Sequence, residues 1–342
     1  MKAMVLAAGL GTRFRPVTDS LPKPLVPLCN RPLVGWAIDS LIDAGVSEVV
    51  VNLHHHPELL RRWLDAEYAG RCEVRYSLEP EILGTGGGLR KARAHFEGEE
   101  LFFLVNGDSV QFPPWAELAA SVRTTGAVAA MLLRHPPRDD RFTSVWFDGI
   151  RVTAIGPTGS GEPLMFAGVH ALTPDVFEYL SQREFSGMTE DFYVPMLETG
   201  DRAIAGLVHD GVWFDVGSPW RYLQASHELT AALVRGEVAM PRGSRVIADG
   251  SVADESARID GRLSRAVAGR DSVVERDAEV VDSALWEGAR VEAGARVDSS
   301  VVGGEVTIPA GARVANALVW NGERGIVTMA VHPTQPTVTT GL

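Results

Sequence analysis

Apolar residues in the first 235 positions follow two alternating patterns. The runs at 48–53 and 101–106 are continuously apolar and have the length of strands buried on both faces. The segments 33–44 and 57–68 instead repeat apolar residues at helical spacing. Further strands are predicted at 74–78, 144–147, 152–155, 164–172 and 204–208, and further helices at 86–95, 191–197 and 219–235. This alternation predicts a doubly wound, Rossmann-like α/β domain, whose ligands bind at the carboxyl ends of the strands.

The helical pattern ends near Val246. Apolar residues then recur six apart, with a five-residue step after every third, at Leu285, Val291, Val297, Val302, Ile308, Val314 and Val319. Glycines and small residues fill the positions between them. Hexapeptide periodicity is typical of a parallel β-helix, and we expect a left-handed one of about four coils, irregular near 260–270. A disordered Gly/Ala tail is the alternative, but the branched residues keep their register.

Composition shifts suggest where the domains end. Pro241 and Gly243 mark a linker after the α/β pattern. We therefore predict a first domain over 1–240, a β-helix over 246–322 and a loose or packing tail over 323–342.

Overall composition narrows the function classes. The 342 residues carry a formal net charge of -12, which argues against a nucleic-acid binder. Two cysteines, Cys29 and Cys72, are too few for a disulfide framework and indicate a reducing compartment. The N-terminus does not look like a signal peptide, and no apolar stretch approaches the roughly 20 residues of a membrane span. We expect a cytoplasmic protein with neither a nucleic acid nor a membrane as partner.

A short apolar run at 4–7 predicts a first buried strand, which leads into a loop suited to phosphate. Gly9 and Gly11 allow close backbone approach to an anion, and Arg13 adds a planar donor fork. Lys23 follows on a turn stiffened by prolines at both sides. The alternative for the glycines alone is a tight strand-to-helix turn with no ligand.

Three later segments also carry candidate chemistry. Four glycines lie within 84–88, just before a predicted helix whose N-terminal amides could face a nucleotide. Asp108 ends an apolar strand, where a carboxylate can hold Mg²⁺ together with substrate phosphates. Asp215 lies in the segment VWFDVGSP. Read alone, the glycines could form a surface turn and Asp108 could cap the next element.

The first loop resembles the signature of the sugar-nucleotide pyrophosphorylases, nucleotidyltransferases that join an NTP to a sugar 1-phosphate. Their pattern, roughly L-A-A-G-x-G-T-R followed by P-K-P-x-x-P, is matched at 6–13 and 22–27. The segment at 212–219 resembles their W-x-D-[IV]-G-[ST]-P motif. The resemblance implies release of pyrophosphate, with Mg²⁺ held by Asp108 and Asp215. It also implies a role in cell-envelope polysaccharide synthesis.

The resemblance assigns roles residue by residue. It implies Arg13, Lys23 and Asp108 as catalytic residues. At the nucleotide it implies Leu6, Ala7, Ala8, Gly9, Gly11, Thr12, Arg13, Glu79, Gly84, Thr85, Gly86 and Gly87. At the sugar it implies Asn106, Gly107, Gly168, Asp191 and Trp213.

One departure from the family pattern affects the sugar phosphate. Most members carry a second phosphate-binding lysine in an E-K-P motif, whereas here Glu162 is followed directly by Pro163. No lysine occurs after Lys91. Arg141, Arg151 or a backbone donor could hold the phosphate instead.

The substrate is left open by these motifs. The β-helix resembles that of mannose-1-phosphate guanylyltransferases, while the missing lysine and the T-G-G-G segment resemble N-acetylmuramate-1-phosphate uridylyltransferases. A catalytically silent subunit that senses NDP-sugar is a third possibility. An acyltransferase activity of the β-helix is disfavoured because 246–320 contains no histidine base. We expect the β-helix to mediate homo-oligomerisation, and His54, His55 and His56 to form a solvated loop.

Overall fold

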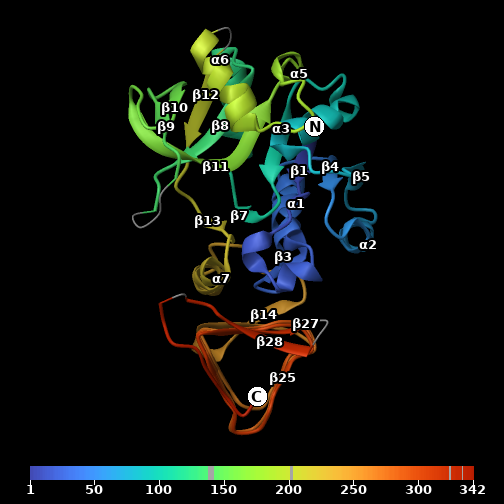
Figure 1. Ribbon diagram of the computed structural model, residues 1–342, viewed down its shortest axis with the longest axis vertical. Coiled ribbons are helices and arrows are strands. Elements are labelled where there is room, and N and C mark those ends of the chain that lie inside the picture. Colours follow the sequence, from blue (N-terminus) through green and yellow to red (C-terminus); the bar gives the residue numbers. More distant parts are fainter. Residues whose placement is uncertain (138–141, 201–202, 323–324, 333) are drawn as a thin grey trace. The chain divides into compact units, whose positions relative to one another are not determined.

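The computed structural model describes residues 1–137, 142–200, 203–322, 325–332 and 334–342 (Figure 1). Its contacts divide the chain into two compact units, which we describe separately. Unit 1 comprises 1–10 and 34–213, and unit 2 comprises 11–33 and 214–342. Among the described residues, no helix combines the length and apolarity needed to cross a membrane. The domain boundaries near 240 and 246 stay a prediction about independent folding.

Unit 1 is built on a mixed sheet. Its parallel half has the order β6–β1–β4–β5, formed by Phe102–Asn106, Lys2–Leu6, Glu48–Leu53 and Glu73–Leu78. These strands confirm the apolar runs predicted from the sequence. The carboxyl ends of β1, β4 and β6 share one edge of the sheet, because the three strands run in the same direction.

The other half of the sheet is not purely parallel. The long strand β11 (Glu162–Leu172) runs antiparallel to both β6 and β8 (Ala129–Arg134), and β8 pairs in parallel with β12 (Ile204–Val208). The start of β11 also pairs with β9 (Val145–Phe147), which pairs with β10 (Val152–Ile155), and Figure 1 shows these two strands curling beside β11. The register of β11 shifts between Phe166 and His170, where Gly168 has a φ of 90°. Glycine adopts this backbone readily, so it marks a β-bulge.

Helices α1 (Leu33–Asp43) and α2 (Pro57–Tyr68) confirm the predictions at 33–44 and 57–68. Helices α3 (Gly84–Lys91) and α6 (Val194–Thr199) differ in extent from the predicted ones, and α4 (Trp115–Thr125) and α5 (Val176–Tyr179) were not predicted. The helix predicted at 86–95 is wrong in its extent: it begins at Gly84 and tightens at Ala92 into the 3₁₀ helix η4 (Arg93–Phe96), where the Ala92 amide is shared by the Gly88 and Leu89 carbonyls. The helix predicted at 191–197 is a π-helix, η5 (Thr189–Tyr193), continued by α6. Pro195 near the start of α6 has no N–H to donate, which favours an altered turn before it.

The core of unit 1 is aromatic and aliphatic. Phe96, Phe102 and Phe177 stack on one another, with centroids 4.2 Å apart for the first two. Within this core the Tyr193 hydroxyl and His170 Nδ1 are 2.6 Å apart. Burial lowers the pKa of His170 to about 3, so this ring is neutral at physiological pH.

Unit 2 begins with the irregular segment 11–33. It contains three 3₁₀ turns, η1 (Thr12–Phe14), η2 (Val17–Asp19) and η3 (Lys23–Leu25), and the short hairpin of β2 (Pro27–Leu28) and β3 (Arg31–Pro32). Unit 2 also contains helix α7 (Pro219–Val234), whose first turn is capped by the Ser218 hydroxyl accepting from the Arg221 amide. Strand β13 (Trp213–Asp215) leads from unit 1 into unit 2.

The rest of unit 2 is a left-handed parallel β-helix, seen nearly end-on as a triangle in Figure 1. One face is the sheet of β14 (Ser244–Ile247), β15 (Ser251–Asp254), β18 (Val267–Ala268), β21 (Ala284–Leu285), β24 (Val301–Val302), β27 (Ala317–Gly322) and β28 (Gly325–Ala330). The second face is the sheet of β16 (Arg258–Ile259), β19 (Val273–Val274), β22 (Arg290–Val291) and β25 (Thr307–Ile308). The third face is the sheet of β17 (Arg262–Ser264), β20 (Glu279–Val281), β23 (Arg296–Asp298), β26 (Arg313–Ala315) and β29 (Val338–Thr340). Strands β15 to β26 make four coils, as predicted.

The coil length explains the five-residue step in the sequence. Val267 pairs with Ala284, Ala284 with Val301 and Val301 with Leu318, so the coils from β18 onward advance by 17 residues. The first coil is shorter, because Val252 pairs with Val267, only 15 residues further on. One corner is turned by left-handed residues at the same interval, namely Arg265, Asp282, Ser299 and Asn316, with φ between 46° and 49°. A coil of two six-residue sides and one five-residue side therefore keeps the same residues inside.

The last strands were not predicted by the hexapeptide pattern. Strand β28 pairs antiparallel with β27, and β29 pairs antiparallel with β26. The segment predicted to be loose or packing thus packs onto the final coil, because its strands continue two of the three sheets.

Hydrogen bonds within unit 2 connect the coils to the segment 11–33. The Trp286 indole donates to the Tyr222 hydroxyl over 2.8 Å, and that hydroxyl donates to the Pro27 carbonyl over 2.8 Å. Asn30 Nδ2 donates to the Ala268 carbonyl over 3.1 Å. We refer to the first pair of bonds as the Trp286–Tyr222–Pro27 chain.

Candidate functional site

The predicted site residues fall into two groups, one in each unit. Unit 1 holds Leu6 to Gly9, Glu79, the glycine-rich segment, Asn106 to Asp108, Gly168, Asp191 and Trp213. Unit 2 holds Gly11, Thr12, Arg13, Lys23 and Asp215. We describe the geometry of each group in turn.

Strand β1 delivers the loop at 7–9 to the carboxyl edge of the sheet. The Ala7 amide donates to Asn52 Oδ1 over 2.6 Å, and Asn52 Nδ2 donates to Glu79 Oε1 over 2.7 Å. Glu79 Oε2 accepts from the Leu83 amide over 3.0 Å. Glu79 is 1% exposed, so its carboxylate ties the ends of β1, β4 and β5 to the start of α3. Its predicted contact with the base stays a prediction.

Asn52 is a functional candidate that the sequence reasoning missed. It is 3% exposed and links the Ala7 amide to Glu79. Its signal in the sequence is a polar residue near the end of the otherwise apolar run EVVVNL. A buried amide must be hydrogen-bonded on both sides, which makes it a precise spacer between two loops.

The glycines at 84–88 have a packing role in this structure. The amides of Gly86 and Gly87 donate to the Ser186 carbonyl, over 2.9 and 3.2 Å, and Thr85 Oγ1 accepts from the Met188 amide. A Cβ at residue 84 would lie 2.5 Å from the Ser186 carbonyl oxygen. This contact is too close for either backbone segment to keep its position. The absence of side chains here therefore admits a neighbouring backbone segment. Contact of Gly84, Thr85, Gly86 and Gly87 with a nucleotide stays a prediction.

Asn106, Gly107 and Asp108 lie beside the end of β1. The Gly107 amide donates to the Leu6 carbonyl over 2.9 Å, and a Cβ at residue 107 would lie 2.8 Å from Val5 Cγ1. Only glycine fits so close to the neighbouring strand. The half-buried Asp108, which follows Gly107 directly, is therefore brought near the start of the predicted phosphate loop.

Three predicted sugar residues lie together around the bulge of β11. A Cβ at Gly168 would lie 2.9 Å from Asn106 Nδ2, so the two residues are in contact. The Trp213 indole donates to the Ala167 carbonyl over 2.9 Å, and Gln111 Nε2 donates to the same oxygen over 2.9 Å. Gln111, in β7 (Ser109–Gln111), is a second residue that sequence reasoning missed.

Asp191 is engaged within its own loop. Its Oδ2 accepts from the Gly187 amide over 2.8 Å, and its Oδ1 lies 3.4 Å from Arg183 Nη1. This carboxylate fixes the turn that precedes the π-helix, and its contact with a sugar stays a prediction.

In unit 2 the two predicted cations lie against glycines. Gly11 has a φ of 61°, and a Cβ there would lie 2.9 Å from Lys23 Cβ, so the lysine side chain crosses this residue. Lys23 is 6% exposed and lies between Pro22 and Pro24. A Cβ at Gly217 would lie 3.0 Å from Arg13 Nη1 and 3.1 Å from Asp215 Oδ2. Arg13 and Asp215 therefore lie close together, and Arg221 Nη1 is 3.5 Å from the same carboxylate oxygen.

Asp108 in unit 1 and Asp215 in unit 2 are each of the ligand type that a divalent cation with few protein ligands takes. Among the described residues, no group of three or more His, Cys, Asp or Glu side chains is arranged so that it could hold a metal ion. His54 instead bonds the Glu79 carbonyl through Nδ1, 2.8 Å away. Asp108 and Asp215 are hard oxygen donors, and Mg²⁺ is typically bound by one or two carboxylates together with substrate phosphates.

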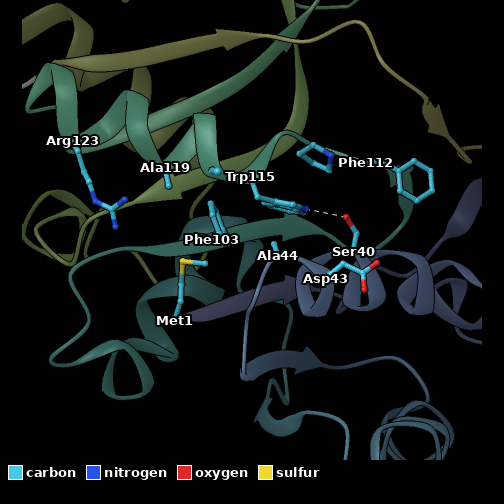
Figure 2. A pocket seen from close by; sticks show the side chains of 11 residues that line it. Met1, Ser40, Asp43, Ala44, Phe103, Phe112, Trp115, Ala119 and Arg123 are labelled. Carbon is cyan, nitrogen blue, oxygen red and sulfur yellow. Dashed lines mark hydrogen bonds between the residues drawn. The ribbon is translucent and has the colours of Figure 1, made fainter. Parts of the chain in front are cut away.

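A separate cavity of about 720 Å³ lies in unit 1 and contains none of the predicted site residues. Figure 2 shows the residues that line it, with Trp115 and Phe103 between Arg123 on one side and Asp43 on the other. The Trp115 indole donates to Ser40 Oγ over 3.0 Å, which holds α4 against α1.

Two family models together match most of the chain. The model described as nucleotidyl transferase matches residues 2–232, and the model described as GlmU-like, C-terminal hexapeptide matches residues 232–328. The probable mannose-1-phosphate guanylyltransferase 2 of Oryza sativa subsp. japonica is 30% identical over 334 residues, covering 89% of this chain and 91% of its own. The mannose-1-phosphate guanyltransferase of Debaryomyces hansenii is 30% identical over 336 residues, with the same coverage of both chains.

The solved structures support the fold of the first part. The crystal structure of HddC from Yersinia pseudotuberculosis complexed with GMP-PN superposes with a TM-score of 0.57 at 22% identity. It covers 67% of this chain and 99% of its own.

Proposed function

The chain belongs to the nucleotidyl transferase family, in its sugar-nucleotide branch, and on that premise we propose that it joins GTP to mannose 1-phosphate. The products are GDP-mannose and pyrophosphate. The observation that carries the proposal is the 30% identity to curated mannose-1-phosphate guanylyltransferases, which extends over both the α/β part and the β-helix.

The proposed reaction needs positioning and charge neutralisation rather than a covalent intermediate. The sugar phosphate oxygen attacks the α-phosphorus in line, and pyrophosphate leaves from the opposite side. Arg13 steadies the leaving pyrophosphate, and Lys23 acts where charge rearranges around the α-phosphorus. Asn106, Gly168 and Trp213 hold the sugar, supported by their clustering at the bulge of β11.

Members of this family generally use a divalent metal, and we propose Mg²⁺ held by Asp108 and Asp215. When bound, such an ion neutralises phosphate charge and orients the phosphates. We also propose that the protein acts in the cytoplasm and self-associates through the β-helix, where Ile326 and Val338 are exposed on the last strands.

A pyrophosphate-release screen tests the proposal. GTP, UTP, dTTP, ATP and CTP are each paired with mannose 1-phosphate, glucose 1-phosphate and N-acetylmuramate 1-phosphate in the presence of Mg²⁺. We expect the highest kcat/KM for GTP with mannose 1-phosphate. Release only from UTP with N-acetylmuramate 1-phosphate would assign the rival substrate, and no release from any pair would indicate a silent sensor.

Asp108→Asn is the matched variant for that screen. It keeps the shape of the side chain but removes its charge, so we expect a loss of turnover on the order of 10²–10³-fold. The fold should be unchanged, as measured by circular dichroism. Near-normal turnover with Mg²⁺ limiting would contradict the proposed metal ligand.

A further inference from the structure

The proposed reaction requires a cation at the phosphate of the incoming sugar. The family places a lysine there, in the E-K-P motif that here reads Glu162-Pro163. These two residues begin strand β11, and Met165, two residues further, pairs with Arg134 at the end of β8. Strand β8, which pairs with β11 directly after the altered motif, therefore ends in a permanent positive charge.

Arg134 lies on a predicted sugar residue. Its guanidinium carbon is 5.0 Å from the centre of the Trp213 ring, and its Nη1 donates to the Gly211 carbonyl over 3.1 Å. The Trp213 ring is itself held in place, because its indole N–H donates to the Ala167 carbonyl beside Gly168. A guanidinium stacked on an aromatic ring is pre-oriented, and its planar fork matches phosphate oxygens.

The altered motif itself helps to fix the end of β8. His135, the residue after Arg134, lies between two carboxylates, with Nδ1 2.7 Å from Asp210 and Nε2 3.0 Å from Glu162. The His135 amide also donates to Asp210 Oδ1 over 2.9 Å. Glu162, which the family uses beside its lysine, here holds the segment from which Arg134 projects.

Other arginines of unit 1 are placed less well. Arg141 lies outside the described residues. Arg151 is exposed, and its backbone amide is held in the turn by Asp148. Arg183 has a side chain that is 78% exposed and ion-pairs with Asp191.

We propose that Arg134 binds the phosphate of the sugar 1-phosphate, in place of the lysine missing from the E-K-P motif. The inference rests on the proposed function and specifies one of its contacts. With the positive charge on β8 instead of β11, a cation still lies beside the predicted sugar residue Trp213. Glu162 then pairs with His135.

The test compares Arg134→Gln with the wild-type protein, using GTP and α-D-mannose 1-phosphate with Mg²⁺. We expect the KM for α-D-mannose 1-phosphate to rise about 10-fold to 100-fold, as for loss of a charged hydrogen bond, while the KM for GTP changes less than about twofold. Calorimetry should show the same loss for α-D-mannose 1-phosphate but none for methyl α-D-mannopyranoside, which has no phosphate. Arg75→Gln, which changes an exposed arginine on the edge strand β5, is the matched control and should behave as wild type.

Each outcome bears on the inference. An Arg134→Gln protein that folds and keeps its KM for the sugar phosphate overturns it, and so does an equal loss for GTP or the mannopyranoside. If this variant does not fold, Arg134→Lys carries the test: a point charge without the fork should raise that KM about 3-fold to 10-fold, and an unchanged KM overturns the inference. Failure of the wild type to bind or turn over any sugar 1-phosphate contradicts the proposed function and the inference together. Wild-type turnover with unaffected variants contradicts the inference alone.

Discussion

Lys23 lies on a turn between Pro22 and Pro24, and its side chain crosses Gly11. Because the turn is stiff, its ammonium loses little mobility when phosphate charge gathers near it. An interaction made mainly in the transition state lowers kcat and kcat/KM together. We therefore expect Lys23→Ala to lower kcat on the order of 10²-fold or more, with NTP affinity changed far less, measured by steady-state kinetics and calorimetry.

Lys23→Arg is the charge-preserving comparison for this residue. We expect incomplete rescue, because a planar fork does not replace a compact point charge in a buried turn. Loss of NTP binding in Lys23→Ala would identify the lysine as a ground-state anchor instead.

His135 provides a pH-dependent contact at the end of β8. Hydrogen bonds to Asp210 and Glu162 raise its pKa above the ordinary 6.5. The charged ring therefore contributes stability that is complete below pH 6.5 and is lost as the pH rises through the raised pKa. In an NMR titration we expect the His135 pKa to exceed 6.5 and to fall in Asp210→Asn.

Asp148→Asn is a suitable control for that titration, because Asp148 caps a turn of its own through the Ile150 and Arg151 amides. It should leave the His135 titration unchanged. A His135 pKa at or below 6.5 in the wild type would show that the two carboxylates do not hold the charged ring in solution.

At the scale of elements, the contact of β6 with β1 depends on Gly107. A methyl group at this position meets Val5 Cγ1 at 2.8 Å and the Leu6 carbonyl at 2.9 Å, and neither strand can move far within the sheet. We expect Gly107→Ala to lower the free energy of unfolding by about 1–3 kcal/mol, measured by urea denaturation. It should also reduce turnover, because Asp108 follows directly.

Gly9→Ala is the control for this steric argument. No atom lies within 4 Å of a Cβ at residue 9, so the substitution should leave the free energy of unfolding nearly unchanged. Equal stability of Gly107→Ala and the wild type would mean that the two strand ends do not approach so closely.

The sequence predicts the regular elements well where one pattern dominates. Strand β4 and helix α2 have the predicted bounds, because EVVVNL is mostly apolar and Pro57 fixes the start of the helix. The 17-residue coil follows from the spacing of Leu285 and Val302, since inward residues of a β-helix must stack. Strand β28 was missed because its residues lack the hexapeptide repeat and pair only with the edge strand β27.

The candidate site was less accessible to sequence reasoning than the fold. A motif identifies Asp108, but the neighbours of Asn52 and Arg134 depend on strand order and register, which single-sequence periodicity does not encode. The glycines at 84–88 suggested open backbone, whereas the segment around Ser186 fills the Cβ positions of the first three and Glu79 fills that of Gly88. The sign of Asn52 in the sequence was one polar residue next to the last position of an apolar strand.

At the scale of the whole molecule, the β-helix and the turn that carries Lys23, here called the lysine turn, belong to one compact unit. The Trp286–Tyr222–Pro27 chain joins a coil to the segment that follows Lys23. In Trp286→Phe the buried Tyr222 hydroxyl loses its donor, at a cost of about 0.5–1.5 kcal/mol. We expect a lower melting temperature and a reduced kcat, with sugar 1-phosphate binding by calorimetry unchanged.

Trp63→Phe, on α2 in unit 1, controls for the general effect of removing an indole. An unchanged kcat in a destabilised Trp286→Phe protein would show that the coils support the fold without influencing the lysine turn.

The 17-residue coil also sets a rule for how this protein can change in length. Loss of a single residue from a coil would turn the inward valines of that side, such as Val291 or Val297, toward solvent. Gain or loss of 17 residues at once replaces one stacked layer by another and leaves every later side chain facing as before. The regular coils from β18 onward can therefore be added or removed as whole layers without turning any later side chain, while the α/β part tolerates single insertions in its loops.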